Sequence, residues 1–171
     1  MRIAVIGGGN MGEAIVAALL RQKVLTPDEV TVSDINPSRL EQLTRQYGIN
    51  TTANNSNAVE GAEVVILAVK PQIFDGVAGG LKNTIQNGQL VLSIIAGVNI
   101  DRLSRELNHR RIVRAMPNTP AQIGEGMTVW TASPEVSRLQ KGKARTIIKV
   151  MGDDLYVEEE KFIDMATAIS G

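Results

Sequence analysis

Short runs of apolar, mostly β-branched residues alternate along the chain with stretches that have helical periodicity. Buried strands are predicted at Arg2–Ile6, Val30–Ser33, Val64–Val69, Leu90–Ser93 and Ile112–Arg114. Helical spacing of apolar residues is found at Met11–Leu20, Ser38–Tyr47 and Ile100–Leu107. Strands that are apolar on both faces are typical of a parallel sheet covered by helices. The pattern therefore predicts an α/β fold with a doubly wound, mostly parallel sheet.

Capping residues support two of these helices. Asn36 is the expected N-cap of the second helix, with Pro37 in its first turn. Either Asn99 or Asp101 is the expected cap of the third. These residues place the start of both helices a few positions beyond a predicted strand.

The last third of the chain has a less regular pattern. Strands are predicted at Met127–Thr131 and Leu155–Val157, on either side of a helix over Pro134–Met151, and their direction in the sheet is left open. A final helix is predicted over Glu158–Gly171. Its three leading carboxylates would lie in the first turn, where the helix dipole favours negative charge.

A Gly-x-Gly-x-x-Gly pattern lies directly between the first predicted strand and the following helix, the context in which it indicates a dinucleotide site. Gly7 permits the tight turn, Gly9 lets the backbone approach a pyrophosphate, and Gly12 lets the helix pack closely. Free N–H groups at the helix start can bind the phosphates. The predicted loop residues are Gly7, Gly8, Gly9, Asn10, Met11 and Gly12. The alternative is a glycine-rich turn without a ligand.

Asp34 follows the second predicted strand and is the 22nd residue after Gly12. An acidic side chain at this spacing accepts hydrogen bonds from the adenosine ribose. At ~4 Å and an effective dielectric of about 20 it would oppose a 2′-phosphate by several kcal/mol, which favours NADH over NADPH. Ser33, Asn36 and Arg39 can hold a phosphate if Asp34 turns away, so NADPH stays open. Asp34 as a simple turn former is the alternative.

Three more segments follow predicted strands, at Ala68–Gln72, Ser93–Gly97 and Met116–Pro120. Ligands of open α/β sheets bind beyond the carboxyl ends of the strands, so these segments are expected to wall the cofactor site. Alternatively, their prolines only end the elements, and Lys70 is a surface charge rather than a cofactor contact. No set of nucleophile, base and orienting residue is recognisable, so the chemistry is expected to come from a cofactor.

Composition narrows the function classes further. The 18 Lys and Arg balance 18 Asp and Glu, which argues against a nucleic-acid or anionic-membrane surface. Arg110, Arg111 and Arg114 are expected in a solvated loop and strand edge. Cysteine is absent and the one histidine, His109, is expected in a solvated turn, so no metal site is predicted. No apolar stretch approaches the roughly 20 residues of a membrane span, and a cytoplasmic location is expected.

Several segments in this order closely resemble the pyrroline-5-carboxylate reductases. The resemblance rests on residues 6–12, 68–72, 93–97, 114–120 and 164–171. It implies a Rossmann fold and reduction of the cyclic imine 1-pyrroline-5-carboxylate to L-proline by NADH or NADPH. Ser33 and Asn55 would neighbour the ribose or 2′-phosphate. The nicotinamide and its ribose would lie against Ala68, Val69, Lys70, Pro71, Ala96 and Gly97.

The same resemblance implies a division of the chain. Residues 1–157 would form the dinucleotide-binding domain and 158–171 the first helix of a truncated helical domain. In the relatives, that domain dimerises and completes the substrate site, so a homo-oligomer is expected. Members often have Ser, Asn or Arg after the second strand to accept NADPH, and Asp34 departs from this pattern.

A protonated C=N bond is already electrophilic, so hydride delivery needs orientation and exclusion of water more than a strong acid. Met116, Asn118 and Thr119 are the candidates for lining the substrate pocket. Two alternatives are a related β-hydroxyacid-type dehydrogenase and a non-catalytic dinucleotide-binding relative, because one fold serves many activities.

Overall fold

The computed structural model describes residues 1–170, apart from the side chains of Thr119 and Ser170. The predicted role of the Thr119 side chain therefore lies outside the described part. The strands are β1 Ile3–Ile6, β2 Val30–Ser33, β3 Asn50–Thr52, β4 Val64–Leu67, β5 Leu90–Ser93, β6 Ile112–Pro117, β7 Gly126–Ala132 and β8 Gly152–Tyr156. The α-helices are α1 Asn10–Arg21, α2 Pro37–Tyr47, α3 Asn55–Val59, α4 Phe74–Leu81, α5 Ile100–Leu107, α6 Arg138–Lys149 and α7 Lys161–Ser170.

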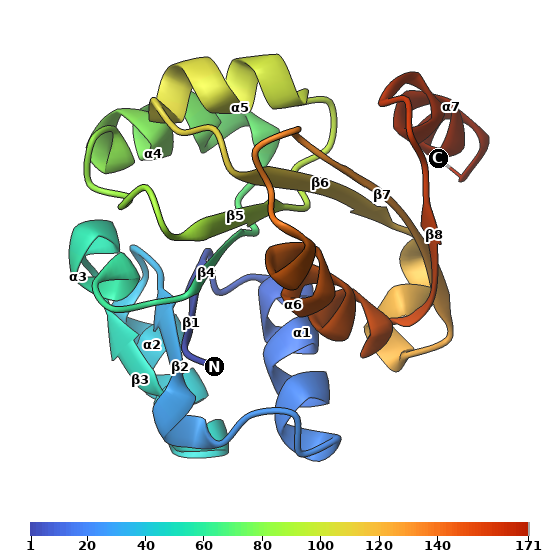
Figure 1. Cartoon of the computed structure of the whole chain (residues 1–171). Coiled ribbons are helices and arrows are strands. Elements are labelled where there is room, and N and C mark those ends of the chain that lie inside the picture. Colours follow the sequence, from blue (N-terminus) through green and yellow to red (C-terminus); the bar gives the residue numbers. More distant parts are fainter. Residues whose placement is uncertain (171) are drawn as a thin grey trace.

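The strands form a single mixed sheet in the order β3-β2-β1-β4-β5-β6-β7-β8 (Figure 1). β1 to β6 run parallel, β7 is antiparallel to β6, and β8 is parallel to β7. From β1 the chain adds β2 and β3 on one side of β1, and it then adds β4, β5 and β6 on the other side of β1. The predicted doubly wound, mostly parallel sheet is therefore confirmed, and the strand order is that of the Rossmann fold.

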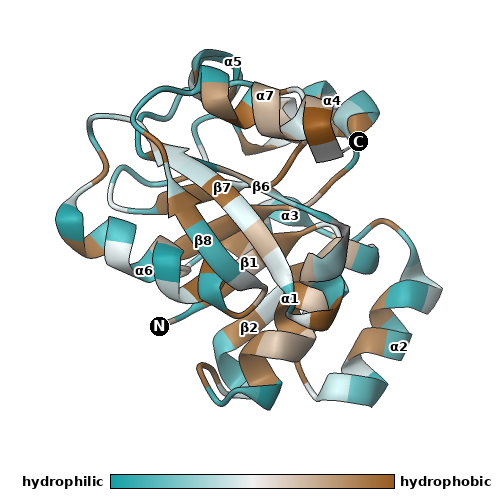
Figure 2. Ribbon diagram, turned by 90° about the vertical axis from the view of Figure 1, so that its right-hand side faces the viewer, coloured by the Kyte–Doolittle hydropathy of each residue, from teal (hydrophilic) through white to brown (hydrophobic). Residues whose placement is uncertain are grey.

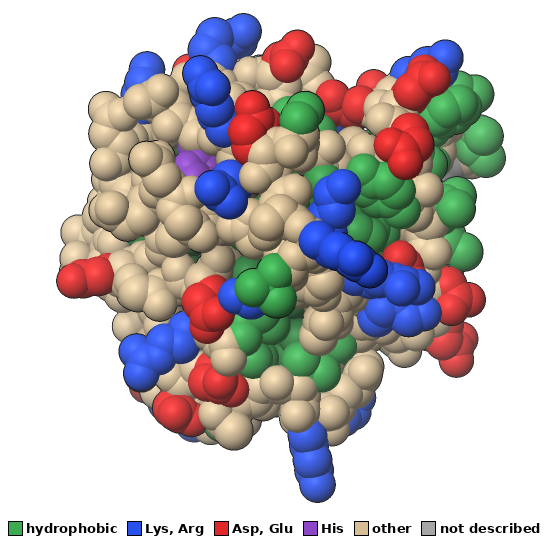
Figure 3. Space-filling model, in the orientation of Figure 1, with side chains coloured by type: hydrophobic (Ala, Val, Ile, Leu, Met, Phe, Trp, Pro, Cys, Tyr) green, Lys and Arg blue, Asp and Glu red, His purple; other side chains and the backbone are tan. Residues whose placement is uncertain are grey.

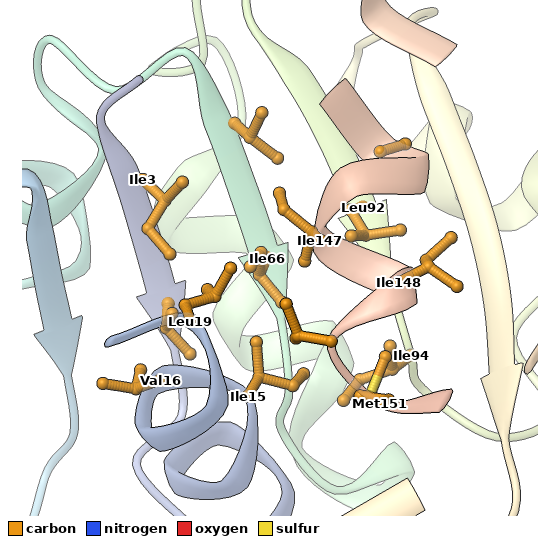
Figure 4. Packing of buried hydrophobic residues seen from close by; sticks show 14 of the residues in the cluster. Ile3, Ile15, Val16, Leu19, Ile66, Leu92, Ile94, Ile147, Ile148 and Met151 are labelled. Atoms are coloured by element: carbon orange, nitrogen blue, oxygen red, sulfur yellow. The ribbon is translucent and has the colours of Figure 1, made fainter. Parts of the chain in front are cut away.

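Helices cover both faces of the sheet. Figure 2 shows α4, α5 and α7 on one side and α1, α2 and α6 on the other. Alternate residues of a strand point to opposite faces, so Ile3 and Val5 join the core beneath α1 and α6, while Ala4 and Ile6 join the core beneath α4 and α5. Figure 4 shows Ile15 of α1 in the first of these two cores.

Several element boundaries differ from the sequence prediction. β4 ends at Leu67, two residues early, because the chain then turns into the loop. β6 continues to Pro117, since β7 supplies an antiparallel partner beyond Arg114. α6 begins only after Ser137, which forms a capping box with Gln140. α7 begins at Lys161, so the three carboxylates precede the helix rather than occupy its first turn.

Some elements were not predicted at all. They are β3, α3, α4 and the short 3₁₀ turns Pro27–Glu29, Pro71–Ile73 and Thr119–Ile123. α4 contains Gly76, Gly79 and Gly80, and glycine lowers helix propensity. The helix forms because Phe74 and Leu81 are fully buried against the sheet.

Two predictions of solvent exposure were wrong. His109 is only 4% exposed, and its Nε2 lies 2.8 Å from the carbonyl oxygen of Gln89. Burial lowers the pKa of His109. Arg114 is 1% exposed and forms ion pairs with Glu160 and Asp164. Both side chains are enclosed by elements that are distant in sequence, which local polarity does not reveal.

The surface carries mixed charge. Figure 3 shows basic and acidic side chains interspersed over one face, with hydrophobic side chains gathered where α7 and β8 lie. The exposed hydrophobic residues there include Leu155, Phe162, Met165 and Ile169. No helix among residues 1–170 is long and apolar enough to cross a bilayer.

Candidate dinucleotide site

A cavity of about 350 Å³ opens at the carboxyl edge of the sheet, beside the ends of β1, β2 and β4. Its volume lies within the roughly 300–1,000 Å³ typical of ligand pockets. Ile6 of β1 pairs with Ser33 of β2 and with Leu67 of β4, so these three strands end side by side. This is the point where the strand order reverses, which is where ligands bind in such sheets. The lining residues are Ile6, Gly7, Gly9, Ser33, Asp34, Ile35, Asn55, Ala68, Val69, Lys70, Ile73 and Val77.

The three motif glycines meet different steric demands. Gly7 has φ +105°, and a Cβ there would lie 2.7 Å from the Ala68 carbonyl oxygen. A Cβ on Gly12 would overlap the Gly7 carbonyl oxygen. A Cβ on Gly9 would meet nothing within 4 Å, so the space beside Gly9 is open. This open space at the mouth of the cavity is where a pyrophosphate can approach the backbone.

The N-terminus of α1 faces this opening. Gly9 is the N-cap and, having no side chain, provides no capping hydrogen bond. The first N–H group paired with the loop belongs to Glu13, which donates to the Gly9 carbonyl. The N–H groups of a helix's first turn have no partner within the helix, and the dipole favours negative charge there. The structure therefore fits a bound phosphate at this end of α1.

Asp34 lies at the rim of the cavity and is held in place by two backbone N–H groups. Its Oδ2 accepts from Gly8 N at 2.8 Å, and its Oδ1 accepts from Asn36 N at 2.9 Å. Each carboxylate oxygen has a second lone pair, so the group can still accept from a ribose hydroxyl. Next to it, the buried Ser33 hydroxyl donates to Oδ1 of Asn55.

Arg39 is not among the residues that line the cavity. Its guanidinium donates to the Gly8 carbonyl and pairs with the Glu13 carboxylate. Both backbone polar groups of Gly8 therefore have side-chain partners: its N–H donates to Asp34, and its carbonyl accepts from Arg39. The side chain predicted as a possible phosphate ligand thus contacts the glycine loop itself.

Glu13 and Tyr47 extend this cluster, because the Tyr47 hydroxyl donates to Oε1 of Glu13 at 2.8 Å. Burial opposes ionisation of Glu13, but the hydrogen bonds from Tyr47 and Arg39 outweigh it and lower the pKa of that carboxyl. Burial and the hydrogen bond to Glu13 raise the pKa of Tyr47 to about 12. The positive charge of Arg39 is thus compensated before any ligand binds.

The structure divides the other predicted residues into two groups. Ala68, Val69 and Lys70 line the cavity, and the Ala68 carbonyl and the Val69 side chain lie beside Gly7 of the glycine loop. Ala96 and Gly97 follow β5, and Met116 and Asn118 belong to the end of β6 and the turn after it, so they lie farther along the same edge and outside the cavity lining. Pro71 is the first residue of the 3₁₀ turn that follows Lys70 in the sequence.

Asn118 has a structural contact that the sequence did not reveal. Its Oδ1 accepts from the Met127 N–H at 3.0 Å and braces the turn between β6 and β7. The side-chain NH₂ group of Asn118 can still donate to a ligand. Met116 is half-buried and faces the same side of the sheet as Arg114, because alternate strand residues share a face.

Four apolar lining residues were missed, namely Ile6, Ile35, Ile73 and Val77. Ile35 is 88% exposed and Ile73 is 50% exposed. Large apolar side chains that remain in solvent beside a glycine loop are suited to contact a flat aromatic base. The signal in the sequence was an isoleucine directly after Asp34, two residues beyond the end of β2.

A second cavity, of about 410 Å³, lies away from this edge, lined by Asn87, Asn108, His109, Arg110, Arg111 and Glu135. These residues belong to segments that precede β5, precede β6 or follow β7. The cavity has no glycine loop or helix start, so we place the candidate site at the carboxyl edge.

Comparison with known proteins identifies a family and several relatives. The family described as NADP oxidoreductase coenzyme F420-dependent matches residues 2–97. The pyrroline-5-carboxylate reductase of Synechocystis sp. is 38% identical over 171 residues, which cover 100% of this chain and 63% of that protein. The pyrroline-5-carboxylate reductase of Escherichia coli is 34% identical over 99% of this chain and 63% of its own length. The chain thus spans 63% of these relatives.

Solved structures show the same relationship. A pyrroline-5-carboxylate reductase from Coxiella burnetii matches with a TM-score of 0.94 and 34% identity, over 99% of this chain and 63% of that one. The pyrroline carboxylate reductase of Plasmodium falciparum with NADP bound has a TM-score of 0.87 and 26% identity, over 100% of this chain and 62% of that one. The chain therefore belongs to the NADP oxidoreductase coenzyme F420-dependent family and corresponds to the NAD(P)-binding domain of the pyrroline-5-carboxylate reductases.

Proposed function

We propose that this chain is the cofactor-binding part of an enzyme that reduces 1-pyrroline-5-carboxylate to L-proline with NADH or NADPH. The main support is the open space beside Gly9, at the uncapped N-terminus of α1. The relatives that match the whole chain carry the name of this reductase. A homo-oligomer, a cytoplasmic location and a domain boundary after residue 157 are further parts of this proposal.

In this proposal the chain binds and orients, while the cofactor, when bound, supplies the hydride. The N–H groups at the start of α1 hold the pyrophosphate. Asp34 accepts from the adenosine ribose, beside the Ser33–Asn55 pair. Val69, Lys70 and Pro71 wall the nicotinamide ribose, with Lys70 as the cation in the cavity lining.

The substrate would meet the nicotinamide near the ends of β5 and β6. Ala96, Gly97, Met116, Asn118 and the backbone of Thr119 lie on this part of the edge. A protonated imine is already electrophilic, so these residues need to exclude water and fix the angle of approach rather than donate a proton.

For the cofactor we propose a preference for NADH. The Asp34 carboxylate occupies the rim where a 2′-phosphate would lie. Arg39 cannot offset this charge, because it is already paired with Glu13. Release of Arg39 would break that ion pair and its bond to the Gly8 carbonyl.

The test is oxidation of NADH and of NADPH, followed by absorbance, after 1-pyrroline-5-carboxylate is added to the 171-residue chain and to the product of its full reading frame. We expect cofactor binding by both and turnover by the longer product. Binding without turnover by the longer product would favour a non-catalytic relative or another substrate. Gly9→Val is the negative control for binding, and Gly79→Val in α4, where a Cβ also meets nothing within 4 Å, is its matched partner.

A further inference from the structure

Arg114 is a fully charged side chain enclosed by the fold. It lies on β6, is 1% exposed, and pairs in register with Ser93 of β5 and Thr131 of β7. Burial of a charge is costly unless partners compensate it. The proposed function gives this residue no role, because it lies outside the cavity lining.

Two carboxylates on the last segment of the chain compensate Arg114. Its Nη1 donates to Oε1 of Glu160 at 2.8 Å, and its Nη2 donates to Oδ1 of Asp164 at 2.8 Å. The same Oε1 of Glu160 accepts from the Ile100 N–H at 2.7 Å. A single carboxylate therefore joins β6, the first residue of α5 and the residue before α7.

This cluster lies beside the loop that precedes α5. Residues 94–99 connect β5 to α5 and contain Ala96 and Gly97. At the start of this loop, Ile94 N donates to the Leu67 carbonyl at 3.1 Å. Just past its end, Ile100 N donates to Glu160. The loop is thus held at one end by the sheet and at the other by the partner of Arg114.

We propose that Arg114, through Glu160 and Asp164, is a positioning residue that holds the 94–99 loop against the nicotinamide end of the bound cofactor. The inference rests on the proposed function, since it assumes that the nicotinamide lies near Ala96 and Gly97. It concerns only this half of the cofactor. The adenosine half would lie against β1, β2 and α1, whereas the hydrogen bonds of the cluster run to Ile100 and Arg114.

The experiment separates the two halves of the cofactor. The affinity of the 171-residue chain is measured for NADH and for ADP-ribose, which lacks the nicotinamide. Removal of the positioning carboxylate by Glu160→Ala should weaken NADH by about ten-fold and leave ADP-ribose unchanged. The matched control is Glu159→Ala, because Glu159 is 61% exposed and pairs with the neighbouring Lys161 rather than with Arg114.

Variants of Arg114 complete the test. Arg114→Met should reproduce the selective loss of NADH affinity, and Arg114→Lys should restore part of it. Thermal unfolding of each variant shows whether it is folded. If Arg114→Met does not fold, Glu160→Ala still tests the inference, because the Glu160 side chain is partly exposed.

Equal loss for both ligands, or no loss for either, would overturn the inference while leaving the proposed function in place. A wild-type chain that binds neither ligand would overturn the proposed function and this inference with it.

Discussion

The charge of Asp34 should decide between the two nicotinamide cofactors. Asp34→Asn removes the charge but preserves the shape of the side chain. The remaining amide oxygen can keep one of the two bonds that Asp34 accepts from Gly8 N and Asn36 N. The lost bond should cost about 1 kcal/mol of folding stability, so the variant is expected to fold.

The size of the effect follows from the position of the carboxylate. At ~5 Å and an effective dielectric of about 20, two unit charges repel by about 3 kcal/mol. Asp34 is only half-buried, and water and salt at the rim reduce this value. We therefore expect the ratio of Kd for NADPH to Kd for NADH to fall by about ten-fold or more, which corresponds to about 1.4 kcal/mol.

The assay is titration of each cofactor by its fluorescence, at low and at high salt. The wild-type ratio should decrease as salt rises, and the ratio in Asp34→Asn should depend less on salt. Asp75→Asn is the control, because it makes the same change in net charge on the exposed surface of α4. An unchanged ratio in Asp34→Asn, or an equal change in Asp75→Asn, would refute the placement of Asp34 beside the ribose.

Three further outcomes are expected. Gly9→Val should abolish binding of both cofactors with little change in the melting temperature, since the added side chain extends into the open cavity; retained binding would remove the pyrophosphate from this loop. Tyr47→Phe should lower the free energy of urea unfolding by about 1 kcal/mol, because it removes the hydrogen bond to Glu13; no change would show that this bond is not net stabilising. Burial lowers the pKa of His109 in the folded state, so the unfolded state binds more protons and the free energy of unfolding should fall as the pH drops below the ordinary value of 6.5. His109→Gln should make the free energy of unfolding depend less steeply on pH between pH 7.5 and pH 5, about the range in which histidine titrates. An unchanged pH dependence would contradict the lowered pKa of His109.

Local features of the sequence were sufficient for β1, β2 and β5 and for the glycine loop. β1 and β5 are short and buried at every position, and β2 is short and largely buried, so their length and composition identify them without any partner. The Asn36 side chain caps α2, and the Asn99 side chain caps α5, because an Asx residue satisfies helix N–H groups within three positions.

Other features depended on contacts between distant segments. α4 exists despite its glycines because Phe74 is buried, and β3 is a strand because β2 lies beside it. The antiparallel direction of β7 is set by the turn that Asn118 braces, which periodicity does not encode.

The surroundings of the charged residues also came only from the tertiary structure. Sequence alone identified the loop from Gly7 to Gly12 because its requirements are steric and local. It did not show that the Arg39 side chain points to the Gly8 carbonyl, or that the Arg114 side chain of β6 is buried beside α7. The energy of a charged group depends on which partners replace its water, and those partners are brought together only when the chain folds.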